Sequence, residues 1–160
     1  MTLRRVGIIS SLIIIISHGL CSSGIFVLVN LNYERLNRRR IYINKGLINI
    51  APSLTFWWFL LISRNIAFPF SLNFFSEIIL ISRIVSFSLL IIILLVLVSF
   101  FRAVYSLYLY SYTQHGIVIS LIKRFFNINI REFLLLILHW VPLNLLFLKL
   151  DLFNFYLCSL

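Results

Sequence analysis

Acidic side chains are nearly missing from this chain. Among 160 residues there are 4 Asp and Glu against 14 Lys and Arg, and charged residues make up 11%. A soluble globular domain carries about 25% charged residues, so this composition excludes an ordinary soluble domain. Disorder is excluded too, because disordered chains are poor in hydrophobic and aromatic residues, which here reach 62% and 16%. A chain of this size has too little interior for so much apolar surface, so most of it must face lipid.

Cysteine, glycine and methionine are also scarce, with two, five and one residues. Cys21 and Cys158 lie inside apolar runs without the spacing of a disulfide framework or a metal site, and we interpret both as small apolar side chains. The chain has no glycine-rich phosphate loop, no Cys-x-x-Cys, no nucleophile elbow and no solenoid repeat. The chemistry of soluble enzymes is therefore absent, and the sequence predicts no bound metal or cofactor.

Long hydrophobic runs are what the chain has in abundance. A hydrocarbon core about 30 Å thick is crossed by about 20 apolar residues in a helix. We predict an all-α, polytopic membrane protein with one membrane domain over residues 1–160 and four spans at about 8–31, 52–85, 86–110 and 132–156. Arg4 and Arg5 imitate the start of a signal peptide, but the apolar run continues to Val29 and is long enough to span.

The stretch 52–85 is too long for one straight span, about 50 Å as a helix, and too short for two spans with a turn. Proline removes a backbone donor and clashes with the preceding turn, so we expect one helix broken near Pro69. Basic loops stay on the side of synthesis, and a single crossing puts the basic loops 32–49 and 111–131 on one side. The cations are therefore a topology signal, and we expect no nucleic-acid partner.

Glu77 is the first candidate for function, since polar residues at membrane depth are functional hypotheses by default. It lies eight residues beyond Pro69 on a half-helix with no other acid. An ionised carboxylate there costs several kcal/mol unless a cation or water meets it, so this group is suited to gaining and losing a proton. The alternative is a carboxylate near the membrane surface that pairs with Arg83 or Arg64.

His18 is the second candidate, ten residues into the first predicted span and flanked by small polar residues. Imidazole titrates near neutral pH, so His18 is suited to proton transfer; a hydrogen-bonded packing role is the alternative. His139 has a similar depth in the fourth predicted span, which leaves a haem held between His18 and His139 as a rival hypothesis. His115 falls in a loop, where we expect it to be solvated.

Short motifs along nearly the whole chain carry a family resemblance. They are HGLCSSG at 18–24, NYER at 32–35, INKG at 43–46, FWWFL at 56–60, SLN at 71–73, YSLYLYS at 105–111, QHG at 114–116, LHW at 138–140 and PLNLL at 142–146. With these motifs the chain resembles the antiporter-like membrane subunits of mitochondrial NADH–ubiquinone oxidoreductase, respiratory complex I. The resemblance is to the C-terminal part of subunit 4 in its arthropod form.

The resemblance implies a multi-pass protein of the mitochondrial inner membrane, bound to other membrane subunits of complex I and contributing to its proton pathway. No cofactor is expected in this chain. Glu77 would correspond to the glutamate on the family's broken helix near the outlet half-channel, and His18 to a histidine of the central polar axis. The family's broken helix usually has two prolines, whereas this chain has only Pro69 there. About the last third of the family is covered, without the earlier acid and lysines, so we expect the fragment to be inactive alone.

Five arginines depart from the family, whose members carry serine at these positions: Arg38, Arg40, Arg64, Arg83 and Arg102. Family members are also rich in methionine, whereas this chain has 26 Ile and one Met. We hypothesise that a mitochondrial gene has been translated with the wrong genetic code, which reads serine codons as arginine and methionine codons as isoleucine.

Two other functional readings remain at this stage. One is a non-catalytic membrane anchor or haem-binding helical bundle, and the other is a non-functional partial copy of a longer gene.

Overall fold

The computed structural model describes residues 5–37, 40, 44–86, 90–117 and 129–149. The regular elements of these residues are all helices: α1 (Arg5–Leu36), α2 (Leu47–Ile50), α3 (Pro52–Asn65), α4 (Leu72–Val85), α5 (Leu90–Gln114) and α6 (Ile130–Leu148). Three of them are long and apolar enough to cross a membrane, over Gly7–Leu36, Ile91–Gln114 and Ile130–Leu148. The predicted all-α membrane fold is therefore confirmed.

The helix ends differ from the predicted span boundaries. α1 extends beyond the predicted span 8–31 at both ends, and α5 begins and ends later than the predicted span 86–110. α6 begins before residue 132, while the last part of the predicted span 132–156 lies outside the described residues. Hydropathy marks the thickness of the hydrocarbon core, whereas backbone hydrogen bonds continue a helix past it into polar sequence.

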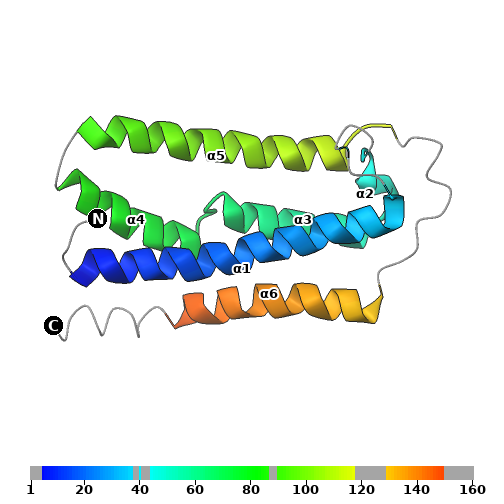
Figure 1. Cartoon of the computed structure of the whole chain (residues 1–160), viewed down its shortest axis with the longest axis horizontal. Coiled ribbons are helices and arrows are strands. Elements are labelled where there is room, and N and C mark those ends of the chain that lie inside the picture. Colours follow the sequence, from blue (N-terminus) through cyan, green and yellow to red (C-terminus); the bar gives the residue numbers. More distant parts are fainter. Residues whose placement is uncertain (1–4, 38–39, 41–43, 87–89, 118–128, 150–160) are drawn as a thin grey trace.

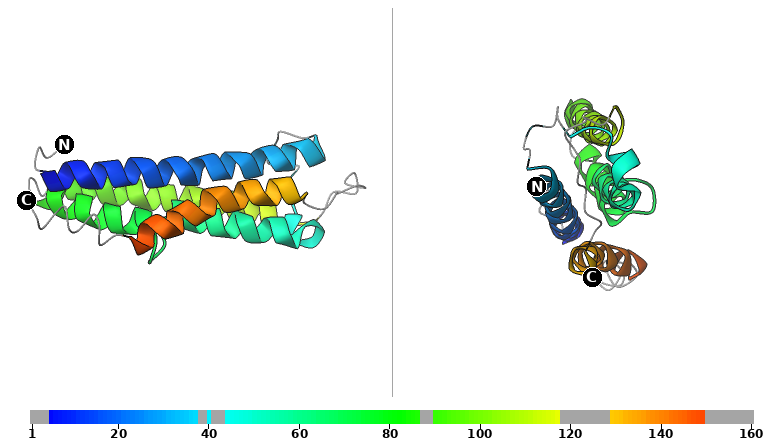
Figure 2. Two further views of the ribbon diagram at one scale, coloured as in Figure 1. Left: turned by 90° about the horizontal axis from the view of Figure 1, so that it is seen from below. Right: turned by 90° about the vertical axis from the view of Figure 1, so that its right-hand side faces the viewer.

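The helices run side by side along one long axis (Figure 1). α3 and α4 lie end to end beside α1, and α5 and α6 lie on opposite sides of the layer that these three helices form (Figure 2). At 14 residues each, α3 and α4 are about 21 Å long and too short to cross a membrane singly. A crossing by the α3–α4 pair stays a prediction.

The segments after α1 and α5 meet at one end of the bundle. The Gly46 amide donates to the His115 carbonyl at 3.3 Å, and the Lys45 ammonium lies 4.4 Å from the centre of the Tyr112 ring. His115 is exposed, as a loop position requires. The two predicted basic loops therefore share one end of the molecule, which a single crossing by α3 and α4 requires; Lys123 and Arg124 lie outside the described residues.

The apolar core lies where α1, α3 and α6 meet. Its fully buried members are Leu28, Leu54, Trp58, Leu61 and Leu136. At Gly24 an added Cβ would lie 3.1 Å from the Leu61 side chain and 3.4 Å from the His139 Cβ, so the small residue lets the three helices approach closely. Cys21, predicted as a small apolar side chain, is buried and donates to the Leu61 carbonyl at 3.1 Å. Cys158 lies outside the described residues.

An ion pair fastens the end of α1 to the start of α6. The Arg35 guanidinium pairs with the Glu132 carboxylate, and their side chains are 7% and 19% exposed. Glu132 also accepts a hydrogen bond at 3.0 Å from the Asn129 backbone N–H at the start of α6. The acid therefore has a fixed place at the helix N-terminus, where the helix dipole favours a negative charge.

α5 presents most of its apolar surface to the surroundings. Ile93, Leu94, Val96, Phe100 and Phe101 are all at least 60% exposed. In water this row of side chains would be costly, whereas in hydrocarbon it costs nothing.

Candidate functional site

The break between α3 and α4 spans residues 66–71. α3 ends at Asn65, four residues before the proline at which the sequence places the interruption. Ala67 and Phe70 flank Phe68–Pro69 with φ of 62° and 66°, a left-handed conformation that non-glycine residues adopt at a cost of about 1 kcal/mol or more each. Surrounding contacts must hold this geometry in place.

Hydrogen bonds satisfy the backbone groups that the break releases. The Phe68 amide donates to the Ser63 carbonyl at 3.1 Å, and the Arg64 guanidinium donates to the Phe70 carbonyl at 3.2 Å. Arg64 also donates to the Asn144 side chain of α6. At the start of α4 the Ser71 hydroxyl caps the helix by accepting from the Phe74 amide at 3.2 Å. Such partners are required at membrane depth, where unpaired backbone groups cost several kcal/mol each.

Glu77 lies in the half-helix after the break and pairs with an arginine of α5. Its Oε1 is 2.6 Å from Nη1 of Arg102, and the two side chains are 21% and 33% exposed. This partner is neither of the two arginines that the surface alternative proposes, Arg83 and Arg64. Sequence reasoning could not identify Arg102 as the partner, because it lies 25 positions from Glu77 and on a different helix. The carboxylate is largely enclosed and has a positive charge beside it.

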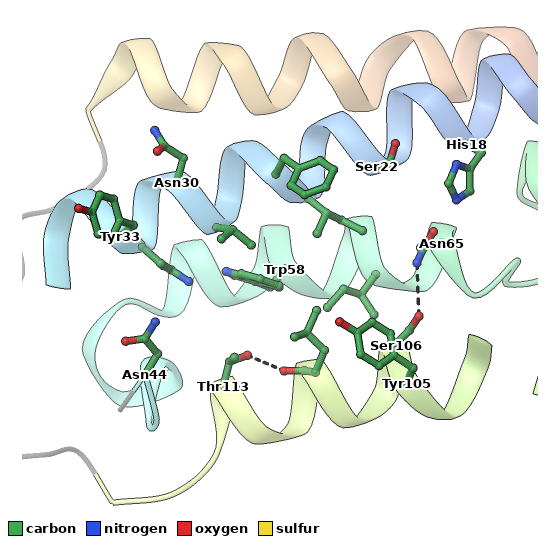
Figure 3. Close-up of a pocket in the computed structure, with 16 residues that line it drawn as sticks. His18, Ser22, Asn30, Tyr33, Asn44, Trp58, Asn65, Tyr105, Ser106 and Thr113 are labelled. Atoms are coloured by element: carbon green, nitrogen blue, oxygen red, sulfur yellow. Dashed lines mark hydrogen bonds between the residues drawn. The ribbon is translucent and has the colours of Figure 1, made fainter. Parts of the chain in front are cut away.

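His18 lines a cavity of about 730 Å³ between α1, α3 and α5 (Figure 3). In that view the ring extends from α1 toward the side on which Asn65 of α3 lies, and Tyr105 and Ser106 line the same cavity from α5. The Asn65 amide donates to the Ser106 hydroxyl at 3.3 Å. The imidazole therefore faces a partly polar space and not a dry core.

Two of the residues that line the same cavity each have a buried polar atom without a hydrogen-bond partner among the described residues. These atoms are Nε1 of Trp58 and Oδ1 of Asn32, on side chains that are 1% and 3% exposed. The Trp58 nitrogen is a donor and the Asn32 oxygen is an acceptor, and a water molecule can serve as the partner of either. The residues that border the cavity therefore include groups on α1 and α3 that lack a hydrogen bond.

The structure does not join Glu77 and His18 directly. Glu77 is not among the residues that line the cavity. The connection that the contacts provide runs along α5, where Ser106 lines the cavity and its hydroxyl donates to the Arg102 carbonyl at 2.9 Å. Arg102, one turn away, holds Glu77. One helix therefore carries a residue of each candidate site.

The two histidines of the haem hypothesis do not face each other. His139 lies on α6 with its Nδ1 2.7 Å from the Leu135 carbonyl, and its Cβ faces Gly24. It is not among the residues lining the cavity of His18, which opens toward α5 on the other side of α1 and α3. A bis-histidine haem site is therefore not formed by these residues.

Comparison with known proteins gives one consistent family. Residues 1–102 match the family described as "NADH:quinone oxidoreductase/Mrp antiporter, TM". The chain is 55% identical over 149 residues to NADH-ubiquinone oxidoreductase chain 4 of Ceratitis capitata. The aligned residues make up 93% of this chain and 33% of the relative. For the same protein of Anopheles arabiensis the identity is 52% over 149 residues, covering 93% and 67%. For Locusta migratoria it is 50% over 155 residues, covering 97% and 35%. The chain thus spans about a third of the length of two of these relatives and two thirds of the other.

Proposed function

The chain belongs to the NADH:quinone oxidoreductase/Mrp antiporter transmembrane family, and we propose that it is the C-terminal part of a proton-translocating subunit of mitochondrial respiratory complex I. The resemblance recognised in its short motifs is confirmed by the relatives named NADH-ubiquinone oxidoreductase chain 4. The remaining two thirds of such a subunit, and the other membrane subunits of the complex, would be its partners in the inner membrane.

The observation that carries this proposal is the environment of Glu77. A carboxylate largely enclosed between two apolar helices, with one arginine as its charge partner, lies six residues beyond a helix break. In a low-dielectric setting, changes in nearby charge or water strongly alter the balance between the ionised and protonated acid. This environment supports the proposal that Glu77 is the proton-exchanging residue.

His18 on α1 is the proposed relay. It faces a cavity that Trp58 and Asn32 also line, and each of these residues has a buried polar atom without a described hydrogen-bond partner. An imidazole can donate through one nitrogen and accept through the other, so it can hand a proton along a chain of water molecules. The Ser106 hydroxyl, which accepts from the Asn65 amide and donates to the Arg102 carbonyl, lies between this cavity and the turn that bears Arg102 along α5.

Oxidation of NADH is not proposed for this chain. No nucleotide-binding or redox motif occurs in its sequence, and electron transfer would belong to other subunits of the complex. We further propose that the chain does not pump protons by itself, since the resemblance places the earlier acid and lysines of the path in the preceding part of the subunit.

Replacing Glu77 tests the proposal in the intact, assembled subunit. Glu77→Gln keeps the size of the side chain and removes the exchangeable charge, so proton pumping per NADH oxidised should fall at least about tenfold. The matched control is Glu34→Gln, which changes an exposed acid near the end of α1 whose carboxylate accepts from the Asn30 amide at 2.7 Å. Pumping should survive that control, and full pumping by Glu77→Gln would contradict the proposal.

A further inference from the structure

Asn73 joins three helices through one side-chain amide. It lies in the first turn of α4 and is 6% exposed. Its Nδ2 donates to the Arg64 carbonyl near the end of α3 at 2.9 Å. Its Oδ1 accepts a hydrogen bond from the Ser17 hydroxyl of α1, and Ser17 is fully buried. Both ends of the planar amide are thus occupied, which leaves it one orientation.

These bonds lie where the fold needs reinforcement. The break is bracketed by the left-handed residues Ala67 and Phe70, and such a geometry persists only when its surroundings over-determine it. The Asn73 amide bridges the break directly, since the Arg64 carbonyl precedes Ala67 and Asn73 follows Phe70. The contact with Ser17 anchors the bridge to α1, an uninterrupted helix.

The position of Asn73 also bears on Glu77. Four residues separate them on α4, so they lie on the same face one turn apart. Any rotation or axial shift of α4 that breaks the Asn73 contacts moves the Glu77 carboxylate relative to Arg102 by a similar amount. The 2.6 Å contact between Glu77 and Arg102 tolerates little displacement. The hydrogen bonds of the Asn73 amide therefore fix the position of the Glu77 carboxylate.

We propose that Asn73 and Ser17 form a latch that sets the position of Glu77 across the helix break. They are positioning residues and carry no proton themselves. The inference rests on the proposed role of Glu77. The Asn73 bond to residue 64 uses only its backbone carbonyl, so this bond is the same whether arginine or serine occupies position 64.

The test uses Ser17→Ala and Asn73→Ala in the intact subunit within its assembled complex. Ser76→Ala is the matched control, because Ser76 is equally buried but its hydroxyl bonds only to carbonyls of its own helix, Leu72 at 3.0 Å and Asn73 at 2.9 Å. Loss of one hydrogen bond should lower protons pumped per NADH by about fivefold in Ser17→Ala, and by more in Asn73→Ala. Ser76→Ala should leave the ratio unchanged.

Two further measurements separate positioning from general damage. In a Glu77→Gln background, Ser17→Ala should cause no additional loss of pumping, since the group that it positions is already gone. A cysteine at Phe70, which is 79% exposed in the break, should react faster with a maleimide when Ser17→Ala is present, and at an unchanged rate with Ser76→Ala.

Each outcome decides the proposal. If Ser17→Ala lowers only the amount of assembled complex while pumping per complex stays normal, the latch does not position Glu77 and the inference is wrong. An additive loss in the Glu77→Gln background overturns it too. If Glu77→Gln itself pumps normally, the proposed function fails; the maleimide rates then still decide whether the latch holds the break.

Discussion

The two sides of the α1–α3 layer hold polar groups in opposite ways. On the α6 side the helices meet in a dry core, and the acid Glu132 is bound twice, by Arg35 and by a backbone amide at 3.0 Å. On the α5 side lie a cavity, two buried polar atoms without described partners, and the acid Glu77, held by Arg102 alone among the described residues. The two acids therefore differ in the number of partners that hold the carboxylate, two for Glu132 and one for Glu77 among the described residues.

This difference suggests a division of labour. The α6 side is mostly apolar and its acid is held by two partners, although the buried Nε1 of Trp140 on α6 has no hydrogen-bond partner among the described residues. The α5 side retains polar groups whose hydrogen bonds are incomplete, and such groups are where water and protons find partners. A site that must exchange protons needs both, a loosely satisfied group and a frame that does not move with it.

The largest effect that we expect is a loss of stability when Glu132 is replaced, which tests the comparison between the two sides of the molecule. Glu132→Gln removes the charge that pairs with a nearly buried arginine and weakens the helix cap, so we expect a loss of about 2 kcal/mol in the free energy of unfolding. Thermal denaturation of the assembled membrane protein measures it. Pumping per folded complex should remain normal; a pumping defect at unchanged stability would reverse the roles assigned to the two acids.

The identity of residue 102 is the next test. If the genetic-code hypothesis is right, the mature protein carries serine there, and Glu77 loses the one cation that the described residues give it. Tryptic digestion followed by mass spectrometry should then show no cleavage after position 102. Arginine found at 102 would end the hypothesis and would keep the Glu77–Arg102 ion pair, in which case Arg102→Ser should alter pumping about tenfold.

A smaller effect is expected from a methyl group added on α1. Gly24→Ala places a Cβ 3.1 Å from Leu61, so the dry core must yield, at a cost of about 1 kcal/mol. Gly19→Ala is its control, because no atom lies within 4 Å of the added Cβ, and the helix should gain slightly in stability. Equal stability of the two variants, measured by thermal denaturation, would mean that the α6 side is not as tightly packed as its contacts indicate.

Sequence reasoning reached the fold class and the existence of the break for physical reasons that are local. Hydrophobic runs of span length and a proline between them need no knowledge of tertiary contacts. The same reasoning did not place the end of α3 at Asn65. A glycine usually marks the left-handed residue that ends a helix, and here that residue is Ala67. It also did not identify the partner of Glu77, because Arg102 had no acid nearby in sequence.

The candidate site was predicted only in part. Glu77 and His18 were selected as costly polar groups at membrane depth, and their roles stay predictions. The same rule applied to Asn73 would have selected it as well, as an amide in an apolar segment. The signal was present, but its partners lie 9 and 56 positions away, so its function as a bridge became visible only once the helices were packed.

Interrupting one long helix also changes its electrostatics. Two short helices replace one macrodipole, so the negative end of α3 and the positive end of α4 face each other near the centre of the bundle, where an uninterrupted helix would have no net pole. In hydrocarbon such half-charges are poorly screened. The break thus has a local field that comes from the backbone alone, a contribution that no side-chain substitution can remove.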